Sequence, residues 1–165
     1  MSVNTEIERK FLIKLPSSSF LLSLPHTEIV QTYLKNDQKG VTERVRKRGL
    51  DGQYVYTHTK KTRIDPMSSI EDESEITQEE YLRLLSRADL DKTPVHKMRC
   101  LIKKGDFTFE IDVYPFWKKQ AVMEVELPNE QAEFVFPDDI CVLREVTGDH
   151  AYSNARIAKC IPQED

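Results

Sequence analysis

Polar and apolar residues alternate along most of this chain, with the period of two that is typical of strands whose two faces differ. In the first such segment Glu6, Glu8 and Lys10 share one face, and Ile7 and Phe11 lie on the opposite face. The pattern returns throughout the chain, so we expect a protein built mostly of antiparallel strands joined by turns. The expected strands cover residues 5–13, 28–35, 41–48, 53–61, 71–76, 94–103, 107–114, 121–127 and 141–146.

Helical patterns are few and short. Thr77, followed three residues later by Glu80, has the spacing of a capping box, and Tyr81 and Leu84 continue at helical spacing. This helix has one apolar side, so we expect it to cover a face of the sheet and to take no part in chemistry. The expected helical segments cover residues 20–24, 78–88 and 151–159.

Like charges gather on single strand faces. One such strand is compatible with a solvated edge strand. Several in one small domain indicate that the charged faces look at one another, because outward charge would leave an apolar interior too thin to need covering helices. The carboxylate pairs are Glu6/Glu8, Glu73/Glu75, Glu110/Asp112 and Glu124/Glu126, and the basic sets are Arg44/Arg46/Arg48, Lys60/Lys61 and Lys97/Arg99.

The predicted fold is therefore α+β and mostly β, a closed antiparallel barrel of eight strands with a few covering helices. A barrel of this size is wide enough to hold one small ligand. The 165 residues, of which 39% are hydrophobic, suit a single domain over residues 1–165. The interior would be a polar tunnel, acidic in part and basic in part.

Composition limits the partners and the location that we expect. A net charge of −4 does not suggest a nucleic-acid partner, and the absence of an 18-residue apolar run argues against a membrane span. Three widely spaced Cys and four scattered His form neither a disulfide framework nor a zinc site. We expect a cytoplasmic protein, and the sequence leaves its oligomeric state open.

A tunnel lined with both signs of charge needs matching partners, because an unpaired buried charge costs several kcal/mol. The carboxylates call for a divalent cation, and the basic residues call for a polyanion. A linear phosphate chain chelated by Mg²⁺ or Mn²⁺ satisfies both, since carboxylate and phosphate oxygens are the hard ligands that these ions prefer. The expected partner is therefore a small anionic substrate.

The opening residues 6–10, Glu-Ile-Glu-Arg-Lys, resemble the Glu-x-Glu-x-Lys signature of the CYTH domain, also called the triphosphate tunnel metalloenzyme family. The resemblance covers nearly the whole chain. Its further parts are Arg44-Val45-Arg46, the strand near Lys60, Lys97-x-Arg99, Glu110-x-Asp112, Glu124-x-Glu126 and Tyr152-x-Asn154.

The resemblance implies an eight-stranded tunnel that binds a triphosphate end-on. Among the basic residues, parity with Tyr54, Tyr56 and His58 favours Lys60 over Lys61 as the one that points inward, and both stay open. The resemblance implies phosphate contacts by Lys10, Arg44, Arg46, Lys60 and Arg99, with Lys97 as a further catalytic residue. It implies metal binding by Glu6, Glu8 and Glu126, and a second metal or a positioned water at Glu110, Asp112 and Glu124.

The activity that this resemblance implies is metal-dependent hydrolysis of the terminal phosphate of a triphosphate, either inorganic tripolyphosphate or a nucleoside triphosphate. Class IV adenylyl cyclase and thiamine triphosphatase share the signature and stay as alternatives. Cyclases of this family carry a His-Phe pair upstream, and nothing before Glu6 resembles it. A third alternative is a module that binds triphosphate or polyphosphate without turnover. Arg9, on the opposite strand face, is expected to tolerate substitution.

Overall fold

The structure, a computed structural model, describes residues 2–164 and consists mainly of long strands. The strands are β1 (Ser2–Lys14), β2 (His26–Leu34), β3 (Val41–Leu50), β4 (Gln53–Arg63), β5 (Ser68–Ile76), β6 (Val95–Lys104), β7 (Phe107–Val113), β8 (Gln120–Glu126) and β9 (Val142–Glu145). The helices are α1 (Ser18–Ser23), α2 (Gln78–Leu84) and α3 (Asn154–Ile157), with 3-10 turns η1 (Leu85–Arg87) and η2 (His150–Tyr152).

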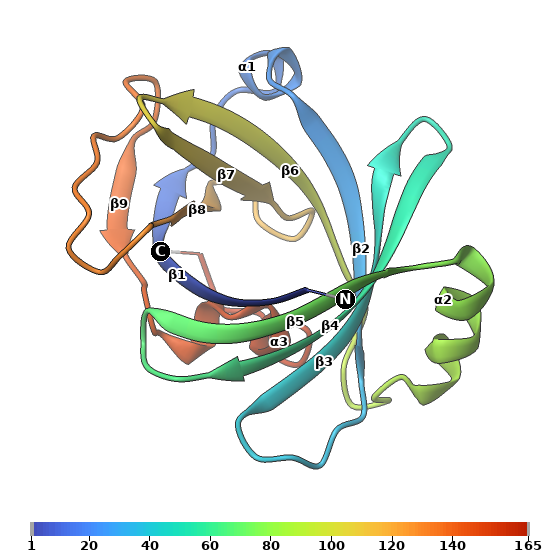
Figure 1. Cartoon of the computed structure of the whole chain (residues 1–165). Helices are drawn as coiled ribbons and strands as arrows, with labels where there is room; N and C mark the ends of the chain where they lie inside the picture. Colours follow the sequence, from blue (N-terminus) through green and yellow to red (C-terminus); the bar gives the residue numbers. More distant parts are fainter. Residues whose placement is uncertain (1, 165) are drawn as a thin grey trace.

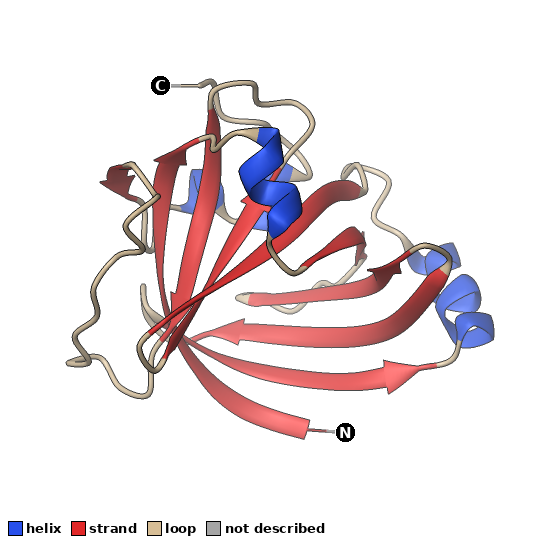
Figure 2. Ribbon diagram, turned by 90° about the horizontal axis from the view of Figure 1, so that it is seen from above, coloured by secondary structure: helices blue, strands red, loops and turns tan. Residues whose placement is uncertain are grey.

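Eight of these strands close into an antiparallel barrel. Their order is β5-β4-β3-β2-β6-β7-β8-β1, and β1 pairs with β5 to complete the ring. β9 adds to the same edge of β1 beyond β5. Figure 1 shows the strands surrounding one interior, with α1 and α2 outside the ring, and Figure 2 shows the same barrel from above. The closed, mostly β fold predicted from the alternation is confirmed.

The apolar core lies mainly on the outer face of the barrel. There Phe11, Phe109 and Met123 pack with residues of α1 and of the loop after β8. A second cluster, which includes Val45 and Tyr81, holds α2 against β3 and β4. The outer strand positions are thus buried by covering segments, which leaves the inner positions free to carry charge.

One end of the barrel interior is filled by apolar side chains. Leu12, Val122 and Tyr114 belong to a buried cluster that also contains Tyr152 and Ile157 from the C-terminal segment. Leu12 and Val122 face each other across β1 and β8, in the same rows as Lys10 and Glu124. The charged interior is therefore limited at this end by a plug of packed side chains.

The predicted elements fall close to the observed ones, with two differences in length. Residues 62–70, which fall between the strands expected over residues 53–61 and 71–76, mostly belong to strands, because β4 continues to Arg63 and β5 already starts at Ser68. The helix expected over residues 151–159 is a 3-10 turn followed by a single helical turn. Asp149 caps the first of these and Ser153 caps the second, so two starts replace one long helix.

Glu43 is a buried carboxylate on the outer face of β3, where it is 2% exposed. It accepts hydrogen bonds from His58 at 2.6 Å, Arg87 at 3.0 Å and Asn36 at 3.1 Å. The group therefore joins β3, β4, η1 and the β2–β3 loop through one carboxylate.

Replacing Glu43 by Gln is expected to lower the free energy of unfolding by about 1–3 kcal/mol at neutral pH. Burial would raise the pKa of Glu43, but hydrogen bonds from His58 and Asn36 and the charge of Arg87 lower it below the usual 4.5. A carboxyl whose pKa falls on folding stabilises the fold above its unfolded-state pKa, and this contribution is lost as the pH falls through the folded-state value. Denaturant unfolding at several pH values should show the difference shrinking below about pH 4.5; a constant difference would contradict the assignment.

Candidate functional site

The barrel encloses a cavity of about 570 Å³, within the size range of ligand sites. Charged side chains from nearly every strand line it. Because residues that pair across antiparallel strands share a face, the inward rows of neighbouring strands meet around this space. The predicted residues that line it are Glu6, Glu8, Lys10, Arg44, Arg46, Arg99, Glu110 and Glu124.

Lys61 lies among three carboxylates at one side of the cavity. Its Nζ is 3.0 Å from an oxygen of Glu6, 3.6 Å from Glu8 and 3.8 Å from Glu71. Burial opposes a charge on Lys61, but Glu8 and Glu6 raise its pKa above the ordinary value. Three carboxylates from β1 and β5 thus share one ammonium, which balances only part of their charge.

Lys10 and Glu124 face each other where β1 pairs with β8, with 3.2 Å between Nζ and a carboxylate oxygen. Burial alone would raise the pKa of Glu124, but Lys10 helps to lower it to about 2. By contrast, burial raises the pKa of Glu8 to about 7, and repulsion from Glu124 adds to this effect. Neighbouring carboxylates in one cavity therefore differ widely in their affinity for a proton.

Asp112 holds Arg99 in a fixed orientation. Its two oxygens accept from Nε and a terminal nitrogen of Arg99 at 2.7 and 2.8 Å, and Lys97 donates to the same carboxylate at 2.7 Å. Glu110 approaches Arg99 from the other side at 2.5 Å. Arg99 therefore reaches the cavity with little freedom to move.

Arg44 and Arg46 bring positive charge into the cavity. Burial opposes the charge of Arg44, but Tyr33 and Glu71 raise its pKa above the ordinary value. Neither guanidinium forms an ion pair within 4 Å in the part of the chain that the structure describes, and the buried Nε of each lacks a hydrogen-bond partner there. Burial and repulsion from Arg44 and Arg99 lower the pKa of Arg46 to about 9. Unused donors beside like charges favour binding of an anion at this point.

Lys60 does not line the cavity, and the prediction that it points inward was wrong. It is exposed on the outer face of β4, whereas Lys61 pairs with Thr42 and shares the inward face of Arg44 and Arg46. The parity argument failed because it took Tyr56 as inward. Tyr56 instead packs on Tyr81 of α2, with ring centroids 4.8 Å apart, outside the barrel.

Three other predicted residues do not line the cavity. Lys97 and Asp112 are fully buried next to Arg99, and Glu126 is exposed where it pairs with Glu8. Asp112 does not fit the role of a metal ligand, because both of its oxygens already accept bonds from Lys97 and Arg99. Its charge orients Arg99 instead.

The sequence reading missed several cavity residues. Glu71 and Arg63 could have been found, since Glu71 shares its strand face with Glu73 and Glu75, and Arg63 shares its face with Lys61. Ser153, Asn154, Arg156 and Lys159 reach the cavity from the C-terminal segment. No periodic pattern marks these four, because only tertiary packing brings them to the barrel. Asn154 alone among them belongs to the family resemblance, in Tyr152-x-Asn154, and no role was predicted for it.

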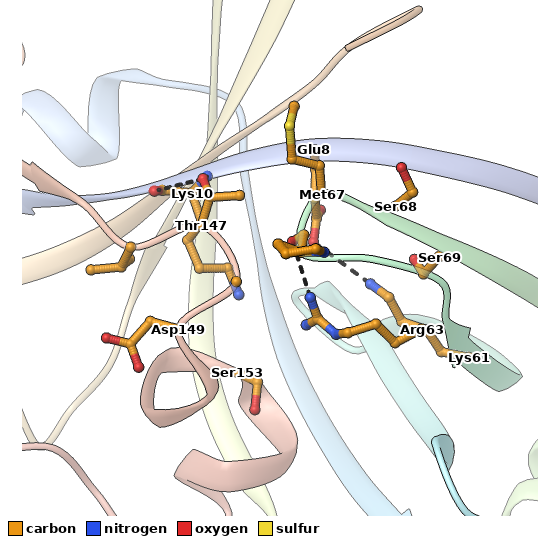
Figure 3. Close-up of a pocket in the computed structure, with 13 residues that line it drawn as sticks. Glu8, Lys10, Lys61, Arg63, Met67, Ser68, Ser69, Thr147, Asp149 and Ser153 are labelled. Carbon is orange, nitrogen blue, oxygen red and sulfur yellow. Dashed lines mark hydrogen bonds and ion pairs between the residues drawn. The ribbon is translucent and has the colours of Figure 1, made fainter.

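A smaller opening of about 20 Å³ adjoins the cavity where the β4–β5 turn meets the loop after β9. Figure 3 shows Arg63 and Met67 on one side of it and Thr147 and Asp149 on the other. Gly148 permits this approach, because its φ is +75° and a Cβ there would lie 2.7 Å from Cβ of Pro66. Glu8 and Lys10 line both spaces.

The carboxylates of the cavity suit a hard divalent cation by their chemistry. Glu6, Glu8 and Glu71 already converge on one positive group, the ammonium of Lys61. As they stand, the described residues contain no group of three or more His, Cys, Asp or Glu arranged to hold a metal ion. These three carboxylates could therefore bind such an ion only if the ammonium of Lys61 moved aside.

A closed antiparallel barrel whose interior carries opposed acidic and basic rows defines the class of this protein. No protein-family model matches the chain, and no curated protein matches it. Among solved structures, the inorganic triphosphatase NE1496 is similar at 29% identity, covering 96% of this chain and 97% of that one, with a TM-score of 0.59.

Two further structures share the fold at lower identity. A putative adenylate cyclase from Bacillus halodurans is 17% identical, covers 79% of this chain and 84% of its own, and has a TM-score of 0.55. The protein PH1012 from Pyrococcus horikoshii is 21% identical, with 76% and 79% covered and a TM-score of 0.56. Together with NE1496, these neighbours confirm the resemblance found in the sequence: the chain is consistent with a CYTH domain and has the triphosphatase/cyclase fold. Among the described helices, none is long and apolar enough to cross a membrane.

Proposed function

We propose that this protein is a metal-dependent triphosphatase that releases the terminal phosphate of a triphosphate bound in the barrel. The observation that carries the proposal is the pair Arg44 and Arg46, whose buried Nε donors lack partners beside the fixed guanidinium of Arg99. A chain of phosphates supplies the anionic oxygens that these groups need. The inorganic triphosphatase NE1496, at 29% identity, supports the same reaction class.

Inorganic tripolyphosphate is the substrate that the cavity favours. Within the described lining residues, Tyr33 is the one Phe, Tyr or Trp, and it is buried, with its hydroxyl bonded to Gln31 at 3.0 Å. Among these lining residues, no exposed Phe, Tyr or Trp ring is therefore offered to a nucleobase, which proteins commonly hold by stacking, and the exposed ring that remains is the imidazole of His150. The charged rows suit the phosphate chain alone.

The basic residues would bind and orient the phosphate chain. Lys10 and Arg99 are held in place by Glu124 and Asp112, and Arg44 and Arg46 add charge without such partners. Preorganised donors of this kind stabilise the charge that develops as the bond to the leaving diphosphate breaks.

Glu6 and Glu8 are the first candidates to hold a Mg²⁺ or Mn²⁺ ion, and Glu110, Glu124 and Glu126 stay candidates for a second one. Such an ion would neutralise phosphate oxygens and lower the pKa of a bound water. Glu71 joins the first set because it shares Lys61 with Glu6 and Glu8.

Replacing Lys61 by Met is expected to tighten Mn²⁺ binding to the substrate-free protein by about tenfold. The variant removes the positive charge that competes for Glu6 and Glu8. Titration with Mn²⁺, followed by electron paramagnetic resonance, measures the affinity. Lys60→Met makes the same chemical change on the outer face and should leave the affinity unaltered. Unchanged or weaker binding in Lys61→Met would count against this cation site.

A panel of substrates and metals tests the proposed function. Tripolyphosphate, ATP and thiamine triphosphate are each incubated with Mg²⁺, Mn²⁺ or chelator, and phosphate release is measured. We expect release from tripolyphosphate that requires a divalent metal. Cyclic AMP formed from ATP would indicate a cyclase instead, and tight binding of tripolyphosphate without hydrolysis under any condition would indicate a binding module.

A further inference from the structure

Asn154 brings an uncharged polar side chain to a cavity otherwise dominated by charge. It is the first residue of α3, directly after the capping residue Ser153, and it lines the cavity opposite the strands. Its side chain is half-buried at the junction between the C-terminal segment and the barrel wall.

The orientation of the Asn154 carboxamide follows from its neighbours. Oδ1 lies 2.5 Å from the hydroxyl of Tyr114 and 3.5 Å from Nζ of Lys97. Tyr114 is 1% exposed, and its hydroxyl has no other acceptor among residues 2–164, so its proton points to Asn154. Burial raises the pKa of Tyr114 well above its usual value, which keeps the proton in place. The atom that faces Tyr114 is therefore the oxygen of the amide.

The amide nitrogen consequently lies on the side of the carboxamide away from Tyr114 and Lys97. Within the described residues its two hydrogens have no acceptor, while the residue itself lines the cavity. Lys97 also donates to Asp112, the carboxylate that orients Arg99. One network thus holds both Asn154 and a phosphate-binding arginine.

We propose that Asn154 donates a hydrogen bond from its amide to a phosphate oxygen of the bound substrate. This inference rests on the proposed function, because it takes the ligand of the cavity to be a phosphate chain. The donor is neutral and its direction is set by the wall, so it selects the position of an oxygen without adding charge. It makes the C-terminal segment part of the substrate site.

The test compares two substitutions: one is expected to disturb the wall less but to repel the anion, and the other is expected to disturb the wall more without adding charge. Asn154→Asp keeps an oxygen for Tyr114 and Lys97 but turns the donor into an anion. Asn154→Ala loses the oxygen as well, yet adds no repulsion. If Asn154 binds phosphate, affinity for tripolyphosphate should fall about 10–100-fold in Asn154→Asp and less in Asn154→Ala. Because the new anion of Asn154→Asp repels tripolyphosphate in any case, the uncharged variant decides the point. If the amide makes no contact with phosphate, Asn154→Ala should bind like the wild type, and if Asn154 only supports the wall, Asn154→Ala should be the weaker binder.

Calorimetric binding of tripolyphosphate and thermal unfolding are measured for each variant. Asn129→Asp is the matched control, because Asn129 lies in an exposed loop where its side-chain oxygen accepts a hydrogen bond from the backbone N–H of Gln131. We expect this control to bind like the wild type and Asn154→Asp to melt no lower than Asn154→Ala. Wild-type affinity in Asn154→Asp, or a larger loss in Asn154→Ala, overturns the inference while leaving the proposed function intact. Failure of the wild-type protein itself to bind tripolyphosphate overturns both.

Discussion

Replacing Lys10 by Ala is expected to abolish measurable phosphate release from tripolyphosphate, a loss of at least about 10²–10³-fold. Lys10 is held at 3.2 Å from Glu124 and lines the cavity beside Glu8. The variant removes a preorganised positive charge and leaves the carboxylates facing the phosphate chain without it. Replacing Glu8 by Ala is expected to have a comparable effect, because it removes a proposed metal ligand. Steady-state phosphate release with Mg²⁺ or Mn²⁺ measures both.

Arg9→Ala is the control for these variants. Arg9 lies on the same strand, between Glu8 and Lys10, but faces outward and pairs with Glu145 at 2.6 Å in a partly exposed position. Loss of such a pair costs little. The control should therefore keep its activity, and circular dichroism should show the barrel intact in all three variants. Full activity in Lys10→Ala or Glu8→Ala would refute the proposed mechanism.

The second large effect concerns stability. Replacing Asp112 by Asn should lower the free energy of unfolding by about 3–5 kcal/mol, the usual result of removing one partner from a buried ion pair. Two buried side chains, Lys97 and Arg99, form ion pairs with this carboxylate. Burial alone would raise the pKa of Asp112, but Arg99 and Lys97 lower it strongly, so the carboxylate stays charged. Among the described residues, an amide of the same shape would leave Lys97 without an ion-pair partner within 4 Å and Arg99 with Glu110 alone. Urea unfolding of the two proteins measures the difference.

Asp106→Asn serves as its matched control. Asp106 is exposed in the turn between β6 and β7, the two strands that carry Lys97, Arg99 and Asp112. The same change of chemistry there should alter the stability by less than about 0.5 kcal/mol. If Asp112→Asn were as stable as this control, the buried ion pairs would not hold these strands in the way described.

The sequence predicted the barrel because charge alternation reports which strand face each residue takes. The rows of Glu6, Arg44 and Glu124 face the interior as expected. Parity fails where aromatic residues are taken as inward, and Lys60 was misplaced for that reason. It also says nothing about depth along a strand, so Asp112 was expected at the ligand although it lies behind Arg99.

The C-terminal contribution could not be predicted from the sequence. Asn154 reaches the cavity because Tyr152 and Ile157 pack on apolar residues at one end of the barrel. Those contacts join residues far apart in the chain, and no local spacing encodes them. The family resemblance included Tyr152-x-Asn154 without giving it a role, and the helical pattern suggested a terminal helix whose position depends on the interior that it covers.

The edge of β1 that β5 and β9 share has a consequence for local stability. Toward β8, Glu8 and Lys10 belong to a regular ladder. On the other edge the amide of Glu8 donates to Met67 O in a turn, and the amide of Lys10 donates to Thr147 Oγ1 in a loop. Hydrogen bonds to loops open more readily than those inside a sheet. We therefore expect the hydrogen bonds of β1 to open more readily on the edge toward Met67 and Thr147 than on the edge toward β8. Glu8 and Lys10 lie on the strand between these two edges.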